Sequence, residues 1–162
     1  MNNLAIAVMN LENETNVGGL IRTANAAALK EVVIVGRKKW NKGAATGAHS
    51  NIKVVRIRTS DEFVDYCKQN NYNIISVEIG KNSKNIFDYE YPENPMLIIG
   101  NEGTGVPKKI LDNSVAEVYI PQYGHVECLN AAVSGSIAIY DWIRKNCKLE
   151  ENGIIEHKFL QE

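Results

Sequence analysis

Three short segments, far apart in the chain, carry amide, arginine and glycine residues that could together hold a ligand. They are residues 16–22 (NVGGLIR), 99–105 (IGNEGTG) and 120–130 (IPQYGHVECLN). Each segment joins an apolar, strand-like run to a stretch with helical spacing. Open α/β sheets bind their ligands at such turns, beyond the carboxyl ends of the strands. The three segments therefore predict the edges of one site.

The first segment has the features of an anion site. Gly18 and Arg22 are four residues apart, so they share one helical face, and helical side chains lean toward the helix N-terminus. Because Gly18 has no side chain, the Arg22 guanidinium could extend back to the free N–H groups of the first turn, which attract anions. This pattern favours a phosphate or similar anion near Arg22. In the alternatives, Asn16 only caps the helix and Arg22 is an ordinary surface arginine.

The second segment combines a flexible backbone with two polar side chains. Its glycines allow the chain to approach a ligand closely or to adopt a positive φ. It matches neither the phosphate loop of nucleotide triphosphatases nor the dinucleotide fingerprint. Glu102 could bind a cationic group or act as an acid or base, whereas in a plain strand-to-helix turn Asn101 and Glu102 would only satisfy nearby backbone groups.

The third segment places a polar amide at the start of an apolar helix. Pro121 ends a strand, Gly124 breaks the loop, and Asn130 follows. A buried amide needs a partner, so Asn130 either faces a ligand or caps the helix. His125 has no second histidine at metal-ligand spacing, and we expect no metal site.

A basic region lies between the first and second segments. It contains no acidic residue, and it interleaves Trp40 and His49 with seven cations: Arg37, Lys38, Lys39, Lys42, Lys53, Arg56 and Arg58. Cations with an aromatic ring suit an RNA backbone and a stacked base. A solvated loop is the alternative, and the local charge excess favours RNA.

The elements that must position these segments alternate along the chain. Apolar or β-branched runs predict strands at 4–9, 31–35, 52–57, 73–77, 96–99 and 115–120, and helical spacing predicts helices at 17–29, 60–69, 106–113 and 129–146. This order predicts an α/β fold with a mainly parallel sheet and helices on both faces. We expect a single domain over 1–162, with 146–162 as a short C-terminal tail.

Composition narrows the class of protein. The 162 residues are 44% apolar, with a net charge of −1 and a pI near 6.3, so the chain can bury a core but is not basic throughout. We expect no signal peptide and no membrane span. The three cysteines, Cys67, Cys128 and Cys147, are widely spaced, which is typical of free thiols in the cytoplasm.

Together, these motifs resemble the SpoU (TrmH-like) family of RNA ribose methyltransferases in the SPOUT superfamily. The motif Asn-x-Gly-x-x-x-Arg is matched at residues 16–22, and a strand followed by Gly-Asn-Glu-Gly-x-Gly is matched at 99–105. Ile-Pro, a short loop and then Leu-Asn opening a long helix are matched at 120–130. The similarity extends over about residues 4–144.

The resemblance implies a C-terminal deep trefoil knot, which is a rare topology, and a homodimer. It implies that S-adenosylmethionine (SAM) donates a methyl group to a ribose 2′-hydroxyl of RNA, with tRNA favoured over rRNA. The implied catalytic residues are Arg22, Asn16, Asn130 and Glu102. The resemblance adds Arg22 to the basic region, so the expected RNA-binding residues are Arg22, Arg37, Lys38, Lys39, Trp40 and Lys42. The implied SAM-binding residues are Ile99, Gly100, Asn101, Gly105, Ile120, Cys128 and Leu129.

Two positions depart from the family pattern. Cys128 replaces the usual serine and is a weaker hydrogen-bonding group. Ala28 stands where the first helix often ends in glycine and could shift the end of that helix. Cys128 motivates an alternative, a non-catalytic RNA- or SAM-binding protein on the same fold, although the presence of Arg22 argues against it. A small-molecule nucleotide-binding protein is a more distant alternative, because its phosphate-loop motifs are missing.

Overall fold

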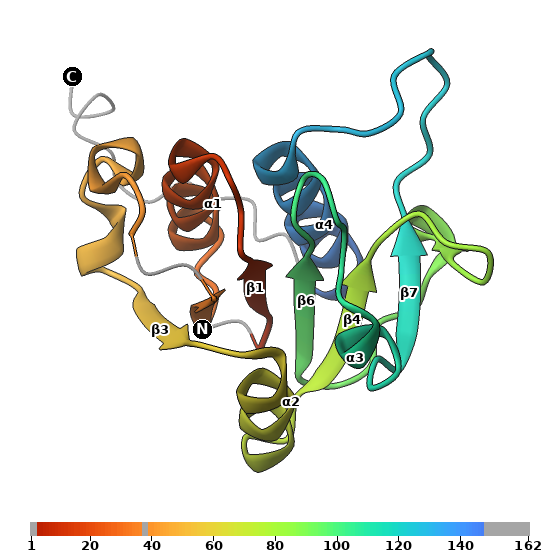
Figure 1. Ribbon diagram of the computed structural model, residues 1–162, viewed down its shortest axis with the longest axis horizontal. Coiled ribbons are helices and arrows are strands. Elements are labelled where there is room, and N and C mark those ends of the chain that lie inside the picture. Colours follow the sequence, from red (N-terminus) through yellow and green to blue (C-terminus); the bar gives the residue numbers. More distant parts are fainter. Residues whose placement is uncertain (1–2, 37–38, 148–162) are drawn as a thin grey trace.

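A single parallel sheet organises the protein (Figure 1). The computed structural model describes residues 3–36 and 39–147, and within them seven strands follow the order β3-β2-β1-β6-β4-β7-β5. All neighbouring strands run parallel, and β1 pairs with β2 on one side and β6 on the other. The strands are β1 (Ala5–Met9), β2 (Glu31–Val35), β3 (Lys53–Ile57), β4 (Asn73–Val77), β5 (Lys84–Asn85), β6 (Pro95–Ile99) and β7 (Ala116–Tyr119).

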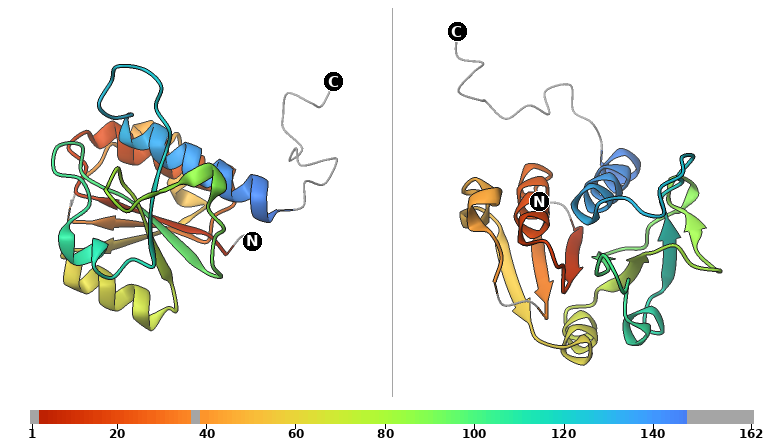
Figure 2. Two further views of the ribbon diagram at one scale, coloured as in Figure 1. Left: turned by 90° about the vertical axis from the view of Figure 1, so that its right-hand side faces the viewer. Right: turned by 45° about the horizontal axis from the view of Figure 1, so that its top comes forward.

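Helices cover both faces of the sheet (Figure 2). The helices α1 (Glu14–Ala26) and α4 (Ala131–Asn146) pack side by side on one face, and α2 (Ser60–Gln69) and α3 (Lys108–Leu111) pack on the other. The described residues also form three 3-10 turns: η1 (Lys42–Ala45), η2 (Ala48–Ser50) and η3 (Ile86–Asp88). The predicted α/β class is confirmed, while the trefoil knot stays a prediction.

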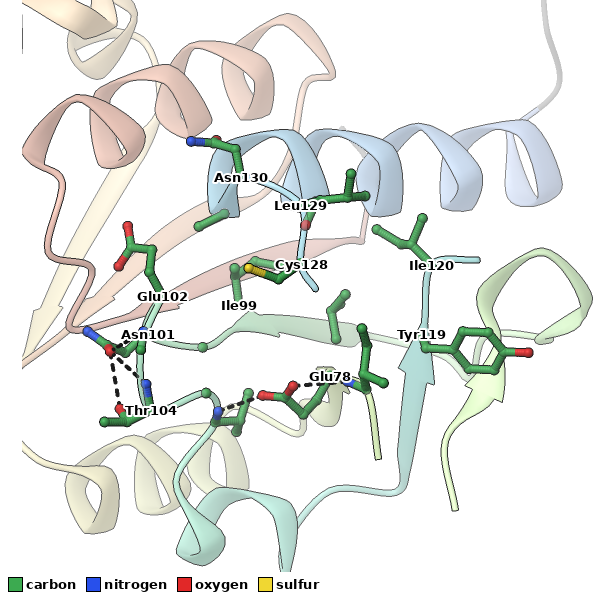
Figure 3. Close-up of a pocket in the computed structure, with 18 of the residues that line it drawn as sticks. Glu78, Ile99, Asn101, Glu102, Thr104, Tyr119, Ile120, Cys128, Leu129 and Asn130 are labelled. Atoms are coloured by element: carbon green, nitrogen blue, oxygen red, sulfur yellow. Dashed lines mark hydrogen bonds between the residues drawn. The ribbon is translucent and has the colours of Figure 1, made fainter. Parts of the chain in front are cut away.

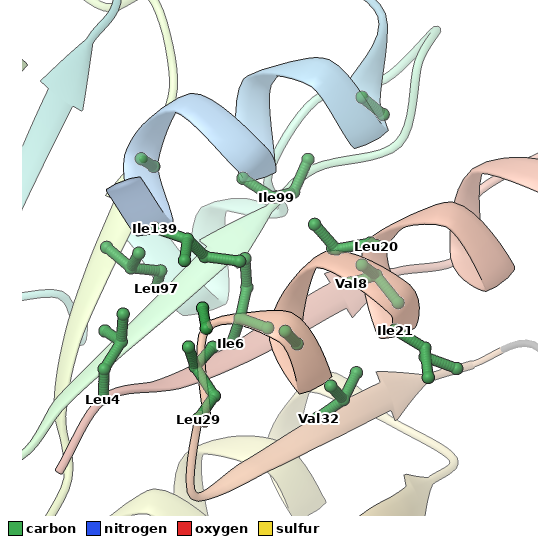
Figure 4. Packing of buried hydrophobic residues seen from close by; sticks show 14 of the residues in the cluster. Leu4, Ile6, Val8, Leu20, Ile21, Leu29, Val32, Leu97, Ile99 and Ile139 are labelled. Carbon is green, nitrogen blue, oxygen red and sulfur yellow. The ribbon is translucent and has the colours of Figure 1, made fainter. Parts of the chain in front are cut away.

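The core divides along the sheet because successive strand residues point to opposite faces. In β1, Ile6 and Val8 enter the cluster under α1 and α4, whereas Ala5 and Ala7 enter the cluster under α2 and α3. Figure 4 shows the first cluster, in which Leu20 of α1 lies near Ile99, and Ile139 of α4 lies near Leu97. The two helices also pack closely, because a Cβ atom on Gly135 of α4 would lie 2.6 Å from Leu20 Cδ1.

Several predicted boundaries move by a few residues. Helix α1 begins at Glu14, with Asn13 as its cap, so Asn16 lies inside the first turn and is not the N-cap. The Asn13 side chain accepts the Thr15 N–H at 2.9 Å, which satisfies a group that would otherwise be free at the helix start. Thr59, one residue before the predicted helix start, caps α2. Strand β5 and the 3-10 turns were not predicted, because such short elements leave no periodic pattern.

Ala28 does not disturb the end of α1. It adopts the left-handed conformation with φ +52°. The Ala28 N–H donates to the Asn25 carbonyl, and the Leu29 N–H donates to the Ala24 carbonyl, each at 3.0 Å. These are the two bonds of a Schellman cap, in which glycine is the usual left-handed residue. The alanine therefore keeps the geometry of the glycine but carries the strain of a Cβ atom.

Among the described residues, no helix combines the length and apolar character needed to cross a membrane.

Candidate active site

The predicted first and second segments meet where the connections leave the sheet in opposite directions. Strands β1 and β6 are neighbours, with Val8 opposite Ile99, so the loops that follow them start side by side. In doubly wound sheets this switch point is where ligands bind. The Asn101 side chain donates to the Asn10 carbonyl at 2.8 Å and joins the two loops directly.

A chain of hydrogen bonds connects one residue from each of the three segments. Asn16 Nδ2 donates to Glu102 Oε1 at 2.9 Å, and Asn130 Nδ2 donates to Asn16 Oδ1 at 3.0 Å. The second carboxylate oxygen of Glu102 accepts the Glu12 N–H at 2.8 Å. The structure thus brings together three of the four predicted catalytic residues, and it fixes both ends of the Asn16 amide.

The environment of Glu102 keeps it ionised. Partial burial raises its pKa, but the backbone N–H of Glu12, further backbone groups and the Asn16 amide stabilise the charged form, and the net effect lowers the pKa. An ionised carboxylate only accepts hydrogen bonds, so it dictates that the Asn16 nitrogen faces it and that the Asn16 oxygen faces Asn130.

Asn130 has two functions at once. Its Oδ1 accepts the N–H groups of Ala132 and Val133 at 3.0 and 3.2 Å and so caps α4, while its Nδ2 binds Asn16. The sequence left open whether Asn130 caps the helix or belongs to the site. The structure shows that one side chain does both. Each amide atom is used, and the orientation of the side chain is fixed.

Asn101 shapes the second segment from within. Its Oδ1 accepts the N–H groups of Gly103 and Thr104 at 2.9 and 3.0 Å, and its backbone pairs with that of Gly105. Gly105 has φ +67°, and a Cβ atom on Gly100 would lie 2.5 Å from the Val106 nitrogen. The glycines are therefore required by the folding of this loop back on itself.

A cavity of about 610 Å³ lies beyond the carboxyl ends of β4, β6 and β7 (Figure 3). Glu102 and Asn130 lie at one end of it, and Tyr119 and Ile120 lie on the β7 side. Its size and its mixed lining are those of a site for a small organic ligand. All seven predicted cofactor residues line it: Ile99, Gly100, Asn101, Gly105, Ile120, Cys128 and Leu129.

Arg22 stands apart from this cluster. It is exposed on α1, does not line the cavity, and forms no hydrogen bond or ion pair with any residue that the structure describes. The space beside Gly18 is not open to the guanidinium, because a Cβ atom there would lie 2.6 Å from Ala44 Cβ and from the Asn41 carbonyl oxygen. Close packing of η1 against α1 explains this glycine, and the predicted path of Arg22 over Gly18 is wrong.

The basic region is only partly suited to RNA. Lys39 and Lys42 are exposed beside η1, but Trp40 is only 8% exposed and packs edge-on against His49 in the core. A buried indole has no free face for a base, so the predicted stacking role of Trp40 is wrong. Arg37 and Lys38 lie outside the described residues. The turn η1, which carries Lys42, packs against α1, whereas the cavity is lined by residues that follow β4, β6 and β7.

A protein-family model matches most of the chain, including all three motifs. The model of the SpoU rRNA Methylase family matches residues 3–140. The chain belongs to the SpoU methylase family. It is 32% identical over 146 residues to a Staphylococcus epidermidis protein assigned to the TrmH family of tRNA/rRNA methyltransferases. That match covers 87% of this chain and 58% of the relative, so this chain spans little more than half of the relative's length.

Solved structures share the fold of this SpoU-family chain. The TrmH/SpoU tRNA modifying enzyme of A. aeolicus superposes with a TM-score of 0.81 at 26% identity, over 90% of this chain and 76% of that one. The AdoMet-bound rRNA methyltransferase of Sinorhizobium meliloti superposes with a TM-score of 0.82 over 90% of this chain and 57% of that one. Its identity of 24% supports similarity of fold alone.

Glu78 and Gln122 line the cavity of this SpoU-family chain but are not among the residues predicted from the sequence. Glu78 follows β4, and its carboxylate accepts the N–H groups of Ile79 and Val106 at 2.9 Å each, which ties the end of β4 to the second segment. Gln122 follows β7 and also lines the cavity. Glu78 could have been found, because it is a carboxylate directly after the predicted strand 73–77. Gln122 could not, because the third motif is defined by the residues on either side of it.

Proposed function

We propose that this chain is a SAM-dependent RNA methyltransferase that transfers a methyl group to a ribose 2′-hydroxyl, with tRNA favoured over rRNA as its substrate. The observation that carries the proposal is the Glu102–Asn16–Asn130 chain at the mouth of the cavity. It joins all three family motifs next to a space large enough for a nucleoside. Membership of the SpoU methylase family supports methyl transfer to RNA.

The cavity fits the methyl donor chemically. Apolar side chains such as Ile99, Ile120 and Leu129 suit a flat base, and the exposed backbone of the second segment suits its polar edges. Gln122 Oε1 is buried there without a hydrogen-bond partner, as expected where a ligand supplies the donor. SAM, when bound, supplies an electrophilic methyl group.

The chain's own residues would position the ribose. The proton that leaves its 2′-hydroxyl would pass to Arg22, or to another acceptor if Arg22 only orients the ribose and its phosphate. The 2′-oxygen must align with the methyl group, and such alignment in a pocket that excludes water lowers the barrier substantially. Asn16, fixed between Glu102 and Asn130, supplies a rigid edge for that alignment. Arg22, exposed on the same helix, suits the RNA phosphate.

We propose further that the protein acts as a cytoplasmic homodimer. Val133 and Tyr140 of α4 are 48% and 52% exposed, and they lie seven residues apart on one helical face. Burial of this face on a second copy would remove apolar surface from water. Light scattering after gel filtration measures the mass directly: two chains are expected, and a monomer at micromolar concentration would contradict the dimer.

Methyl transfer can be tested with labelled SAM and bulk tRNA or rRNA, followed by mapping of the methylated nucleotide. Wild type should label RNA at a ribose, with tRNA preferred, and Arg22→Ala should lose at least about 100-fold in rate. Arg144→Ala is the matched control, because this arginine pairs with Asp141 far along α4 from Asn130. Donor binding without labelling of any RNA would instead support the non-catalytic alternative that Cys128 suggests.

A further inference from the structure

One polar atom of the cavity lacks a partner. Among the described residues that line the cavity, Gln122 Oε1 is the only buried side-chain nitrogen or oxygen with no hydrogen bond. The carboxylate of Glu78 and the amides of Asn101 and Asn130 are all engaged. A buried carbonyl oxygen without a donor destabilises the protein, so a group that occupies the cavity is expected to supply one.

The position of Gln122 indicates which part of a ligand it meets. It follows β7, and β6 and β4 separate β7 from β1, which leads into α1. Strands are spaced about 4.8 Å apart, so β7 and β1 are about 14 Å apart. The reacting methyl group belongs near Asn16 and Asn130, at the α1 side. The opposite end of the donor therefore reaches the β7 side, where Tyr119 and the apolar side chain of Ile120 line the cavity.

We propose that the side chain of Gln122 determines the base specificity of the methyl-donor site by accepting a hydrogen bond from the exocyclic amine of adenine. This inference rests on the proposed function, because it takes the occupant of the cavity to be an adenine nucleoside. The apolar residues bind the faces of the ring without regard to its substituents. The Gln122 amide oxygen then distinguishes an amine from a hydrogen at the 6-position.

Binding of S-adenosylhomocysteine and of its 6-deamino analogue, measured by calorimetry, tests the proposal without catalysis. Wild type should bind the analogue about tenfold more weakly, the effect of one net hydrogen bond. Gln122→Met keeps the length of the side chain but removes the acceptor, so it should bind both ligands with the weaker affinity. Gln122→Glu restores an acceptor and should regain the preference for the amine.

Tyr123→Ala is the matched control, since Tyr123 is the next residue of the same loop but is 97% exposed and does not line the cavity. It should retain wild-type affinity for both ligands. Equal discrimination by wild type and Gln122→Met, or an equal loss for both ligands in Gln122→Met, would overturn the role of Gln122. Failure of wild type to bind either ligand would instead overturn the SAM site itself, so the two failures are distinguishable.

Discussion

Two carboxylates at opposite edges of the sheet are held in opposite ways. Glu31 begins β2 at the amino edge and is only 1% exposed; it accepts the hydroxyls of Tyr66 and Tyr72 at 2.7 and 3.0 Å and pairs with Lys53 at 2.6 Å. Glu102 lies beyond the carboxyl edge, is exposed, and is held by neutral backbone and amide groups.

This difference indicates that Glu31 contributes to the stability of the fold and Glu102 to the function of the site. The charge of Glu31 is neutralised by a lysine and shielded from solvent, so it can contribute to the fold but cannot meet a substrate. The ionised Glu102 carboxylate orients the Asn16 amide by accepting its Nδ2–H group, and Asn130 binds the Asn16 Oδ1 next to an open cavity. The amino edge therefore stabilises the sheet, and the carboxyl edge positions ligands.

The largest expected effect is on catalysis at the carboxyl edge. Asn16→Ala breaks the link between Glu102 and Asn130, so the methyl-transfer rate should fall about 100-fold through loss of alignment. Asn13→Ala is the matched control in the same helix: it removes the cap of α1 and should cost about 1 kcal/mol of stability while activity is kept. Initial rates with saturating tRNA measure both. Equal activity of the two variants would contradict the role of Asn16 in aligning the ribose.

A large effect on stability is expected at the amino edge. Glu31→Ala leaves the hydroxyls of Tyr66 and Tyr72 without their acceptor, which should lower the free energy of unfolding by roughly 2–3 kcal/mol. Urea denaturation measures the loss, and methyl transfer by the folded fraction should not change. Glu31→Gln keeps an acceptor oxygen and should lose less. A selective loss of activity in either variant would show that this edge also serves the site.

Acid should weaken the two edges by the same mechanism. Burial raises the pKa of Glu31, but hydrogen bonds from Lys53, Tyr66 and Tyr72 outweigh it, and the net pKa is lowered, as is that of Glu102. Each ionised carboxylate therefore stabilises the fold fully above its ordinary value of 4.5, and this contribution is lost as the pH falls toward the lowered pKa. Urea denaturation between about pH 5 and 3 should show a flatter pH dependence in Glu31→Gln and in Glu102→Gln than in wild type. An unchanged pH dependence in either variant would contradict the stabilising charge of that carboxylate.

The smallest effect is a gain at the amino edge. Ala28 holds φ +52° in the cap that precedes β2, and glycine adopts this conformation without strain. Ala28→Gly should raise the free energy of unfolding by about 1 kcal/mol with no change in methyl transfer. Thermal denaturation measures the gain, and Ala26→Gly, at the last residue of α1, should instead destabilise, because glycine is the weaker helix former. A loss of stability in Ala28→Gly would show that the cap is not strained.

Much of the fold could be predicted because its periodic signals are strong. The strands at 31–35 and 73–77 have the bounds that the sequence predicts, as continuous apolar or β-branched runs fit a sheet that is buried on both faces. The start of α1 was misplaced because Asn13 and Asn16 are equally good caps in sequence. The choice between them depends on Glu102, which lies 86 residues beyond Asn16 in the chain.

The site was predicted as a set of residues but not as a geometry. The motifs named Asn16, Glu102 and Asn130, and the structure joins them by hydrogen bonds. Trp40 and Gly18 were misinterpreted because the sequence does not show that η1 folds back against α1. An aromatic ring in a basic stretch looks the same whether it faces solvent or the core.

The sequence by itself determined the alternation of strands and helices, the three motifs and membership of the family, because local pattern and residue identity suffice for each. Only the tertiary structure decided that Asn16 links the two other motifs, that Glu78 and Gln122 line the cavity, and that Arg22 stands apart from it. These facts depend on which strands become neighbours. The pairing of β1 with β6 and of β4 with β7 is a long-range choice, set by the packing of the whole core.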